Sequence, residues 1–235
     1  MQRYFAKEKT NEEIILYDTD IHHIKRVMRC KINDHIEVVY DKKVYICQII
    51  NLEPLELKKI KLLNENNELD IKLTIAISLV NEQKFDLILQ KLTELGVTTI
   101  IPIKTERSIV KLDDKKKEKK IDRWQKICKE ASEQSHRCAV PKIENIIDIK
   151  ELINMNNKLK LICSLNENTK PLKNYLQNKP NDILIVIGPE GGFTQKEEKE
   201  LIDNGYLPIS LGKRIMRVET AAIYVTSIIN YICEG

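Results

Sequence analysis

The chain has 235 residues, of which 42% are apolar and 31% charged, and a formal net charge of +4. This composition is typical of a soluble globular protein with one large or two small domains. The first 30 residues carry many charges, and no stretch is long and apolar enough to span a bilayer. We therefore expect no secretory signal and no membrane partner. The mild positive charge permits a polyanionic partner such as RNA without requiring one.

The six cysteines predict a reducing environment and no metal site. None of them belongs to a CxxC pair, and several lie in apolar runs. Scattered thiols of this kind are typical of proteins that are kept reduced, whereas structural zinc ligands come in closely spaced pairs. We expect a cytoplasmic protein that holds no metal.

The first 69 residues predict a small β-rich, barrel-like unit, because they form short runs of strand-forming residues between turns. The predicted strands cover residues 2–5, 13–17, 35–40, 44–51 and 56–63. Asp41 and Lys42 suit a tight turn between the third and fourth of them.

A helix is predicted to interrupt these strands at residues 19–29, with Asp18 or Thr19 as its cap. Its apolar stripe consists of Ile21, Ile24, Val27 and Met28. Its basic residues, which should lie toward solvent, are His22, His23, Lys25, Arg26 and Arg29. This basic face is either an ordinary solvated surface or a surface that contacts RNA phosphates. The two histidines do not indicate a metal, since neighbours on a helix point about 100° apart.

The acidic, Asn-rich segment 64–70 is the predicted domain boundary, and strands and helices alternate after it. The predicted strands cover residues 71–80, 98–103, 142–146, 158–165, 183–187 and 206–211. The predicted helices cover residues 82–95, 115–134, 148–155, 172–177, 194–205 and 219–232. This alternation predicts an α/β domain.

The segment 182–224 contains five of the seven glycines of the chain. The predicted strand at 183–187 ends in the turn GPEGG (188–192), and Thr194-Gln195-Lys196-Glu197 has the spacing of a capping box. A second strand leads into the loop 212–218 and the last helix. We expect these two strand–loop–helix units to lie side by side. Both loops would then lie at the carboxyl ends of their strands, where open α/β sheets bind ligands.

The two loops have no nucleotide-binding motif of the common kinds. GPEGG lacks the GxxxxGK[ST] spacing of a P-loop, and GxGxxG is absent. Each loop alone could simply join a strand to a helix, but two such loops in neighbouring units favour a ligand. Glycine backbone groups can hydrogen-bond a purine edge without an intervening side chain. The second loop adds apolar residues (Leu211, Ile215, Met216) beside basic ones (Lys213, Arg214, Arg217), a mixture that suits an aromatic ring next to charged groups.

Several short motifs, in the same order, make the chain resemble the ribosomal RNA small subunit methyltransferase E family. They are HH with RVMR at 22–29, QKLTELGV at 90–97, ERS at 106–108, EQS at 133–135 with Arg137 and Pro141, GPEGG at 188–192, and LGKRIMRVETA at 211–221. GPEGG alone is moderately specific, but with LGxRIxRxETA about 20 residues later it is highly specific. Met28 and Met216 replace the usual leucine, a swap that preserves side-chain volume.

The resemblance implies both a fold and a reaction. The implied fold is a PUA-like β-barrel over residues 1–69 and a SPOUT α/β domain over residues 70–235 with a deep trefoil knot, assembled as a homodimer. The implied reaction is S-adenosyl-L-methionine-dependent methylation of uridine N3 in 16S ribosomal RNA of the small ribosomal subunit. Two other functions remain possible from the sequence. One is an RNA-binding module without enzymatic activity, and the other is a methyltransferase that modifies a transfer RNA or a different base.

The resemblance also assigns residues to roles. The S-adenosylmethionine site would comprise Leu165, Ile187, Gly188, Pro189, Glu190, Gly191, Gly192, Leu211, Gly212, Ile215, Met216, Arg217 and Thr220. The RNA-binding set would comprise His22, His23, Lys25, Arg26, Arg29, Arg107 and Arg137. For catalysis, Arg217 would stabilise charge on the uridine, assisted by Arg107 or Arg137, with Glu94, Glu133 or Glu190 as a possible base. For each arginine, a structural ion pair or a phosphate contact is the alternative.

Overall fold

A computed structural model of the protein describes residues 1–10, 13–108, 114–166 and 169–234. The chain divides into two compact units: Met1–Glu68 with Lys129–Val140, and Leu69–Cys128 with Pro141–Gly235. The sequence predicted a single boundary after residue 69, and it did not predict that Lys129–Val140 belongs to the first unit. Within the described residues, no helix combines the length and apolar character needed to cross a membrane.

The first unit is built on a four-stranded sheet whose strand order is β1-β4-β5-β6. The strands are β1 (Arg3–Phe5), β4 (His35–Tyr40), β5 (Lys43–Leu52) and β6 (Leu55–Leu63), and a separate pair consists of β2 (Glu8–Lys9) and β3 (Ile14–Ile15). Asp41 and Lys42 have φ of 48° and 58°, the left-handed conformation that the tight β4–β5 turn requires. One face of the sheet buries a cluster that includes Tyr4, Val38 and Ile49.

The predicted basic helix begins as α1 (Asp18–His22) and continues as a π-helix, η1 (His23–Val27). Neither predicted cap was correct, since the N-cap is Tyr17 and its side chain makes no capping hydrogen bond. Ile24 is fully buried, but Val27 and Met28 are 60% and 46% exposed. The wider π-turn changes which residues share a face, so the apolar stripe expected from a 3.6-residue period does not continue through them.

The segment Lys129–Val140 belongs to the first unit because buried charges attach it there. The Arg3 guanidinium, 1% exposed, donates hydrogen bonds to Glu37 at 2.8 Å and to the backbone oxygen of His136 at 2.7 Å. The Lys129 ammonium donates to both Asp20 oxygens at 2.7 and 2.8 Å. Buried charges require such partners, so these pairs fix where the segment lies.

The second unit is an α/β unit with a sheet of order β10-β8-β7-β13-β11-β14-β12, and β9 pairs with β8. Every pairing within this sheet is parallel. The strands are β7 (Lys72–Ser78), β8 (Thr99–Lys104), β9 (Lys142–Ile143), β10 (Ile147–Asp148), β11 (Leu159–Cys163), β12 (Lys170–Pro171), β13 (Asp182–Ile187) and β14 (Leu207–Ser210). The helices are α2 (Glu82–Glu94), α4 (Ile149–Leu152), α5 (Lys173–Leu176), α6 (Gln195–Asp203) and α7 (Val218–Glu234), together with the part of α3 (Asp114–Gln134) that precedes Lys129.

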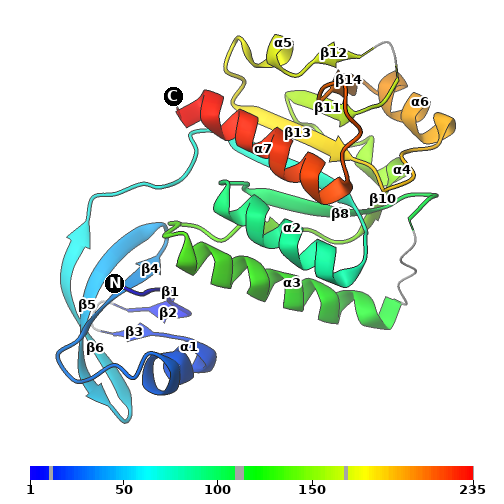
Figure 1. Ribbon diagram of the computed structural model, residues 1–235. Helices are drawn as coiled ribbons and strands as arrows, with labels where there is room; N and C mark the ends of the chain where they lie inside the picture. The colour runs from blue at the N-terminus through cyan, green and yellow to red at the C-terminus, as the bar shows by residue number, and fades with distance from the viewer. Residues whose placement is uncertain (11–12, 109–113, 167–168, 235) are drawn as a thin grey trace. The chain divides into compact units, whose positions relative to one another are not determined.

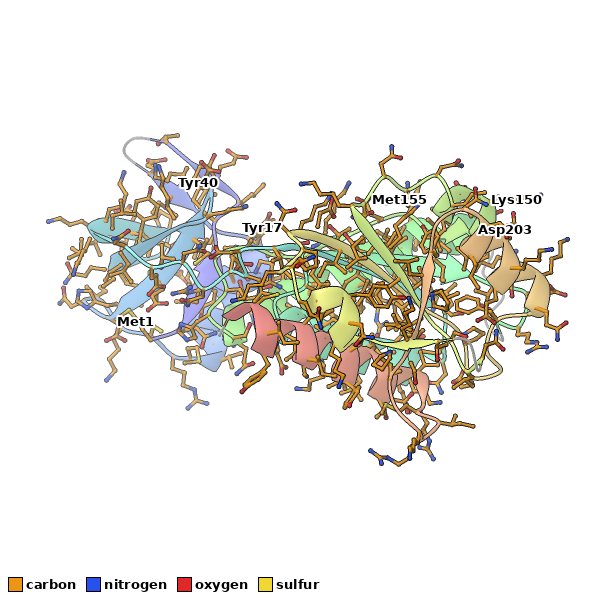
Figure 2. The ribbon with its side chains drawn as sticks, turned by 90° about the horizontal axis from the view of Figure 1, so that it is seen from above. Met1, Tyr17, Tyr40, Lys150, Met155 and Asp203 are labelled. Atoms are coloured by element: carbon orange, nitrogen blue, oxygen red, sulfur yellow. The ribbon has the colours of Figure 1, made fainter. Side chains whose placement is uncertain are left out.

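Helices cover both faces of this sheet, as its buried strands require. On one face α2 and α7 lie next to each other, and α7 contacts β13 (Figure 1). On the other face, Leu184 and Val186 of β13 pack with residues of α4 and α6, including Leu201. Lys150 of α4 and Asp203 at the end of α6 mark these two helices in Figure 2.

The two glycine-rich loops do not follow adjacent strands, contrary to the prediction. β11 lies between β13 and β14 and is parallel to both: Leu161 pairs with Ile185 on one side and with Leu207 on the other. Because all three strands run in the same direction, the loops that follow them emerge at one edge of the sheet. A third loop, after β11, therefore joins the two predicted ones.

Candidate functional site

A pocket of about 390 Å³ lies at the carboxyl ends of β11, β13 and β14. Its walls come from the loop after each of these strands, from Arg107, and from the first turn of α7. The volume falls in the range of ligand pockets, and the lining combines glycine backbone with apolar side chains. Such a site can hold a flat ring against apolar walls while backbone groups hydrogen-bond its edge.

The GPEGG loop is shaped by its glycines and by Phe193. Gly192 has φ of 67°, and its N–H donates to the Pro189 oxygen at 2.8 Å, which closes the turn. At Gly188 an added Cβ would lie 2.9 Å from the Phe193 ring, whereas at Gly191 it would meet only the Arg107 side chain, at 3.4 Å. Phe193 in turn packs against the core cluster under α4 and α6. The glycine at 188 therefore lets a core aromatic residue close one wall of the pocket.

The loop that carries Arg107 is held by three hydroxyl groups. The Ser78, Thr105 and Ser108 hydroxyls lie 2.8 to 3.0 Å from one another, and the Thr105 N–H donates to the Ser108 Oγ at 3.0 Å. From this loop the Arg107 guanidinium donates to the Gly191 oxygen at 2.7 Å. Arg107 thus holds the outer side of the GPEGG loop.

Glu197 connects this loop to the start of α6. One carboxylate oxygen accepts the Thr194 N–H at 2.9 Å, while the Thr194 hydroxyl accepts the Glu197 N–H, which completes the predicted capping box. The other oxygen accepts the Glu106 N–H at 2.7 Å. Glu197 is only 8% exposed, so both oxygens are committed to backbone donors that position the pocket wall.

Glu190 contributes a negative charge to the pocket lining and forms an ion pair with Lys84. The Lys84 ammonium lies 2.9 Å from a Glu190 carboxylate oxygen. Partial burial opposes ionisation of Glu190, but the hydrogen bonds from Lys84 and from its own backbone outweigh burial and lower its pKa. Cys163, which also lines the pocket, has its thiol pKa raised to about 12 by burial. Neither group is prepared to accept a proton or attack as a nucleophile near neutral pH.

Most of the predicted cofactor residues surround this one pocket. They are Leu165, Ile187, Gly188, Pro189, Glu190, Gly191, Gly192, Leu211, Gly212, Ile215 and Met216. The side chains of Arg217 and Thr220 do not line it and are exposed. The lining also contains residues that were not among the predicted cofactor residues: Cys163, Ser164, Asn166, Phe193, Gln195, Glu198, Arg214, Val218 and Ala221. Residues 163–166 could have been found by applying the strand-end rule to the strand predicted at 158–165.

Three predicted catalytic residues lie elsewhere and have structural partners. Arg137 is 3% exposed, and its guanidinium pairs with Glu68, an arrangement that favours the predicted alternative of a structural ion pair. Glu133 is buried and accepts a hydrogen bond from Lys129. Glu94 is exposed on α2, outside the pocket, and pairs with Lys91 at 2.8 Å. These three residues do not line the pocket, and the roles of Arg137 in RNA binding or catalysis and of Glu133 and Glu94 as bases stay predictions.

The predicted RNA-binding residues on α1 and η1 are mostly accessible. His22, Arg26 and Arg29 are exposed, and Lys25 pairs with the exposed Glu53 at 3.4 Å. His23 differs, since its Nδ1 lies 3.0 Å from the Tyr4 hydroxyl, which attaches the π-helix to β1. The exposed Val27 and Met28 lie in the same segment, so this surface combines positive charge with apolar side chains.

Two family patterns together match most of the chain. The RNA methyltransferase PUA domain matches residues 16–62, and the RNA methyltransferase domain matches residues 67–230. These matches confirm the predicted PUA-like β domain followed by an α/β methyltransferase domain. Among the described residues, no group of three or more His, Cys, Asp or Glu side chains is placed to hold a metal ion.

Similar proteins span essentially the same length. The ribosomal RNA small subunit methyltransferase E of Bacillus subtilis is 37% identical over 100% of this chain and 98% of its own, and that of Mesomycoplasma hyopneumoniae is 36% identical over 96% and 97%. A crystal structure of the Neisseria gonorrhoeae enzyme of the same name, bound to S-adenosyl methionine, matches with a TM-score of 0.90 and 31% identity, over 99% of this chain and 98% of that one. A Legionella pneumophila methyltransferase in complex with the same cofactor matches with a TM-score of 0.92 and 28% identity, over 98% of this chain and 97% of that one. The chain therefore belongs to the ribosomal RNA small subunit methyltransferase E family.

Proposed function

We propose that this protein transfers a methyl group from S-adenosylmethionine to N3 of a uridine in 16S ribosomal RNA. The observation that carries the proposal is the single pocket formed by the loops after β11, β13 and β14 in a chain of this family. Two similar proteins of known structure contain S-adenosylmethionine, and the lining of this pocket suits the same molecule.

The pocket residues fit the parts of that cofactor. Backbone groups of Gly188, Gly191 and Leu211 would hydrogen-bond adenine and ribose, between apolar walls that include Ile187 and Met216. The free N–H groups at the start of α7 would favour the carboxylate of the methionine part. When bound, the cofactor supplies an electrophilic methyl group on a sulfonium. The protein's task is then to place the uridine N3 in line with it.

The chain must also help the uridine lose its N3 proton, because a protonated imide is a poor nucleophile. Arg217 is the proposed source of positive charge near the developing anion, and Arg107 is a second candidate. Glu190 is a weak base because its pKa is lowered. N3 is paired in a double helix, so the target nucleotide must be unpaired or flipped out. The exposed Arg26 and Arg29 would bind phosphates of the RNA backbone and would take no part in the methyl transfer itself.

The proposal includes assembly and topology. Large apolar side chains remain exposed on or near α7, including Ile215 at 82% and Tyr231 at 82%, which supports a homodimer. β13 lies between β7 and β11, and α7 returns from β14 to pack on α2, an arrangement that supports the knot implied by the resemblance. Light scattering tests the dimer, and a crystal structure with continuous density from residue 155 to 230 tests the knot. A cytoplasmic location follows from the proposed substrate.

Two measurements test the function. Calorimetry with S-adenosylhomocysteine should show saturable binding; no heat would favour an RNA-binding module without enzymatic activity. Mass spectrometry of 16S RNA from a strain that lacks the gene should show the loss of one methylated uridine, restored by the wild-type gene. Loss of a methyl group from a transfer RNA, with 16S RNA unchanged, would overturn the proposed substrate while leaving the methyltransferase activity intact.

A further inference from the structure

Lys84 occupies a helix position that helix stability does not explain. Asn81 caps α2 by accepting the Lys84 N–H at 3.0 Å, which places Lys84 in the first turn. Capping boxes prefer Glu or Gln at this place, and the helix dipole disfavours positive charge there. The ammonium instead extends to Glu190 of the GPEGG loop, 2.9 Å away. Its side chain is 30% exposed, so Lys84 is an accessible cation beside the pocket wall.

Two further charged residues surround this ammonium. Glu219, in the first turn of α7, favours its protonation, and Arg217 opposes it. The hydrogen bond that Lys84 donates to Glu190 has the largest effect, and together these groups raise the pKa of Lys84. Among the described residues, the buried Oε2 atom of Glu219 has no hydrogen-bond partner. Lys84 is therefore a cation that Glu190 holds beside the pocket, within the electrostatic influence of Arg217 and Glu219.

Glu190, the carboxylate that Lys84 contacts, does not suit proton abstraction. Glu190 is held ionised by Lys84 and has a lowered pKa. Glu198, the other carboxylate in the lining, accepts a hydrogen bond from the Ser164 hydroxyl. A general base acts best when its pKa lies near the working pH, and the lowered pKa of Glu190 does not meet that condition. Positive charge offers the other route, because a nearby cation lowers the free energy of the anion.

We propose that Lys84 is a second cation of the acceptor subsite, which acts with Arg217 to stabilise the N3-deprotonated uridine. This inference rests on the proposed function. The N3 proton passes to water or buffer, and its bonding electrons remain on the base as an anion. N3 then forms a bond to the methyl carbon while the carbon–sulfur bond breaks and its electrons stay on sulfur, which leaves S-adenosylhomocysteine. Glu190 is the positioning residue, since it holds the ammonium at the rim.

The test compares Lys84→Met with Lys91→Met under single-turnover conditions. Lys91 is a matched control, because it lies on the same helix and pairs with Glu94 at 2.8 Å with similar exposure, whereas Glu94, unlike Glu190, does not line the pocket. From the attraction between unit charges several ångströms apart near a surface, Lys84→Met should slow methyl transfer about tenfold. Lys84→Arg should recover most of the rate, and Lys91→Met should match the wild type.

The diagnostic readout is how the defect depends on the acidity of the uridine. The loss in Lys84→Met should shrink as the pH rises, and it should shrink with RNA that carries 5-fluorouridine, whose N3–H is more acidic. Affinity for S-adenosylhomocysteine should not change. A rate defect that is equal at every pH and with both RNAs, a loss of S-adenosylhomocysteine affinity, or no defect would overturn the proposal. If wild-type protein itself fails to methylate uridine N3, the proposed function fails instead.

Discussion

Replacing Glu197 by Gln tests how the pocket wall is held. Glutamine is compatible with a capping box, but it has one acceptor oxygen where Glu197 uses two. In the variant, the amide group must face either the Glu106 N–H or the Thr194 N–H, which now lie 2.7 and 2.9 Å from the two oxygens. Either orientation places a donor against a donor in a site that is 8% exposed.

The chain contains its own control in a second capping box. Asp148 caps α4, and the Asp148 N–H donates to one oxygen of Glu151 at 3.1 Å. This glutamate is exposed, so glutamine at 151 can keep that bond and turn its amide toward water. Glu151→Gln should therefore change stability by less than about 0.5 kcal/mol.

The expected loss in the free energy of unfolding of Glu197→Gln equals the contribution of one hydrogen bond to a charged acceptor. Such bonds contribute about 1.5–3 kcal/mol, and an unsatisfied buried donor keeps its desolvation penalty. For a protein of this size, each kcal/mol lowers the melting temperature by about 2–4 °C, so the variant should melt about 3–12 °C lower. The assay is thermal unfolding followed by circular dichroism, with calorimetry for S-adenosylhomocysteine binding.

Binding should weaken as well, because Glu106 positions the loop from which Arg107 holds Gly191. If Glu197→Gln and Glu151→Gln unfold within 1 °C of each other, the second carboxylate oxygen of Glu197 contributes nothing to stability and the reasoning is wrong. If Glu197→Gln destabilises the protein without weakening binding, the loop is not coupled to the pocket.

Two further predictions concern the pocket and the RNA surface. Gly188→Ala should weaken S-adenosylhomocysteine binding about 5- to 150-fold, the range expected for overpacking of about 1–3 kcal/mol, because its Cβ would lie 2.9 Å from Phe193. Gly191→Ala, with ordinary clearance, should bind within about threefold of wild type by calorimetry, and equal affinities for the two variants would contradict the steric argument. Arg26→Ala and Arg29→Ala should weaken RNA binding and reduce its salt dependence by about one unit of slope each. S-adenosylhomocysteine affinity should stay unchanged in both, and a change in it would refute the separation of RNA and cofactor surfaces.

Much of the architecture could be predicted because local signals agree with the fold. The capping spacing at Thr194, the glycine after α2 and the β-branched run of β13 each identify an element boundary without tertiary information. Short strands such as β12 (Lys170–Pro171) were missed, since two residues carry no periodic pattern. The π-turn at His23–Val27 was also missed, because a widened turn changes the period on which such predictions depend.

The site could be predicted only as far as its loops. Glycine concentration and family motifs identified the loops after β13 and β14, but strand order depends on long-range pairing, so the insertion of β11 between them was not apparent. The arginines show the same limit. Arg107 contacts Gly191 and lines the pocket, while Arg137 is buried and pairs with Glu68. The local sequence does not show which of the two arginines will pair with a buried carboxylate, because that partner is distant along the chain.

The grouping of Lys129–Val140 with the N-terminal unit has a consequence during translation. The Arg3 guanidinium is buried against the backbone oxygen of His136, which is 133 residues later in the chain. At about 5–20 residues per second, that acceptor is synthesised on the order of ten seconds after Arg3. Until then, burying the Arg3 guanidinium of β1 would cost free energy, because the His136 oxygen is not yet there to accept its hydrogen bond. The N-terminal unit therefore cannot finish folding when residues 1–68 have emerged from the exit tunnel. It must wait for residues 129–140, when more than half of the polypeptide has been synthesised.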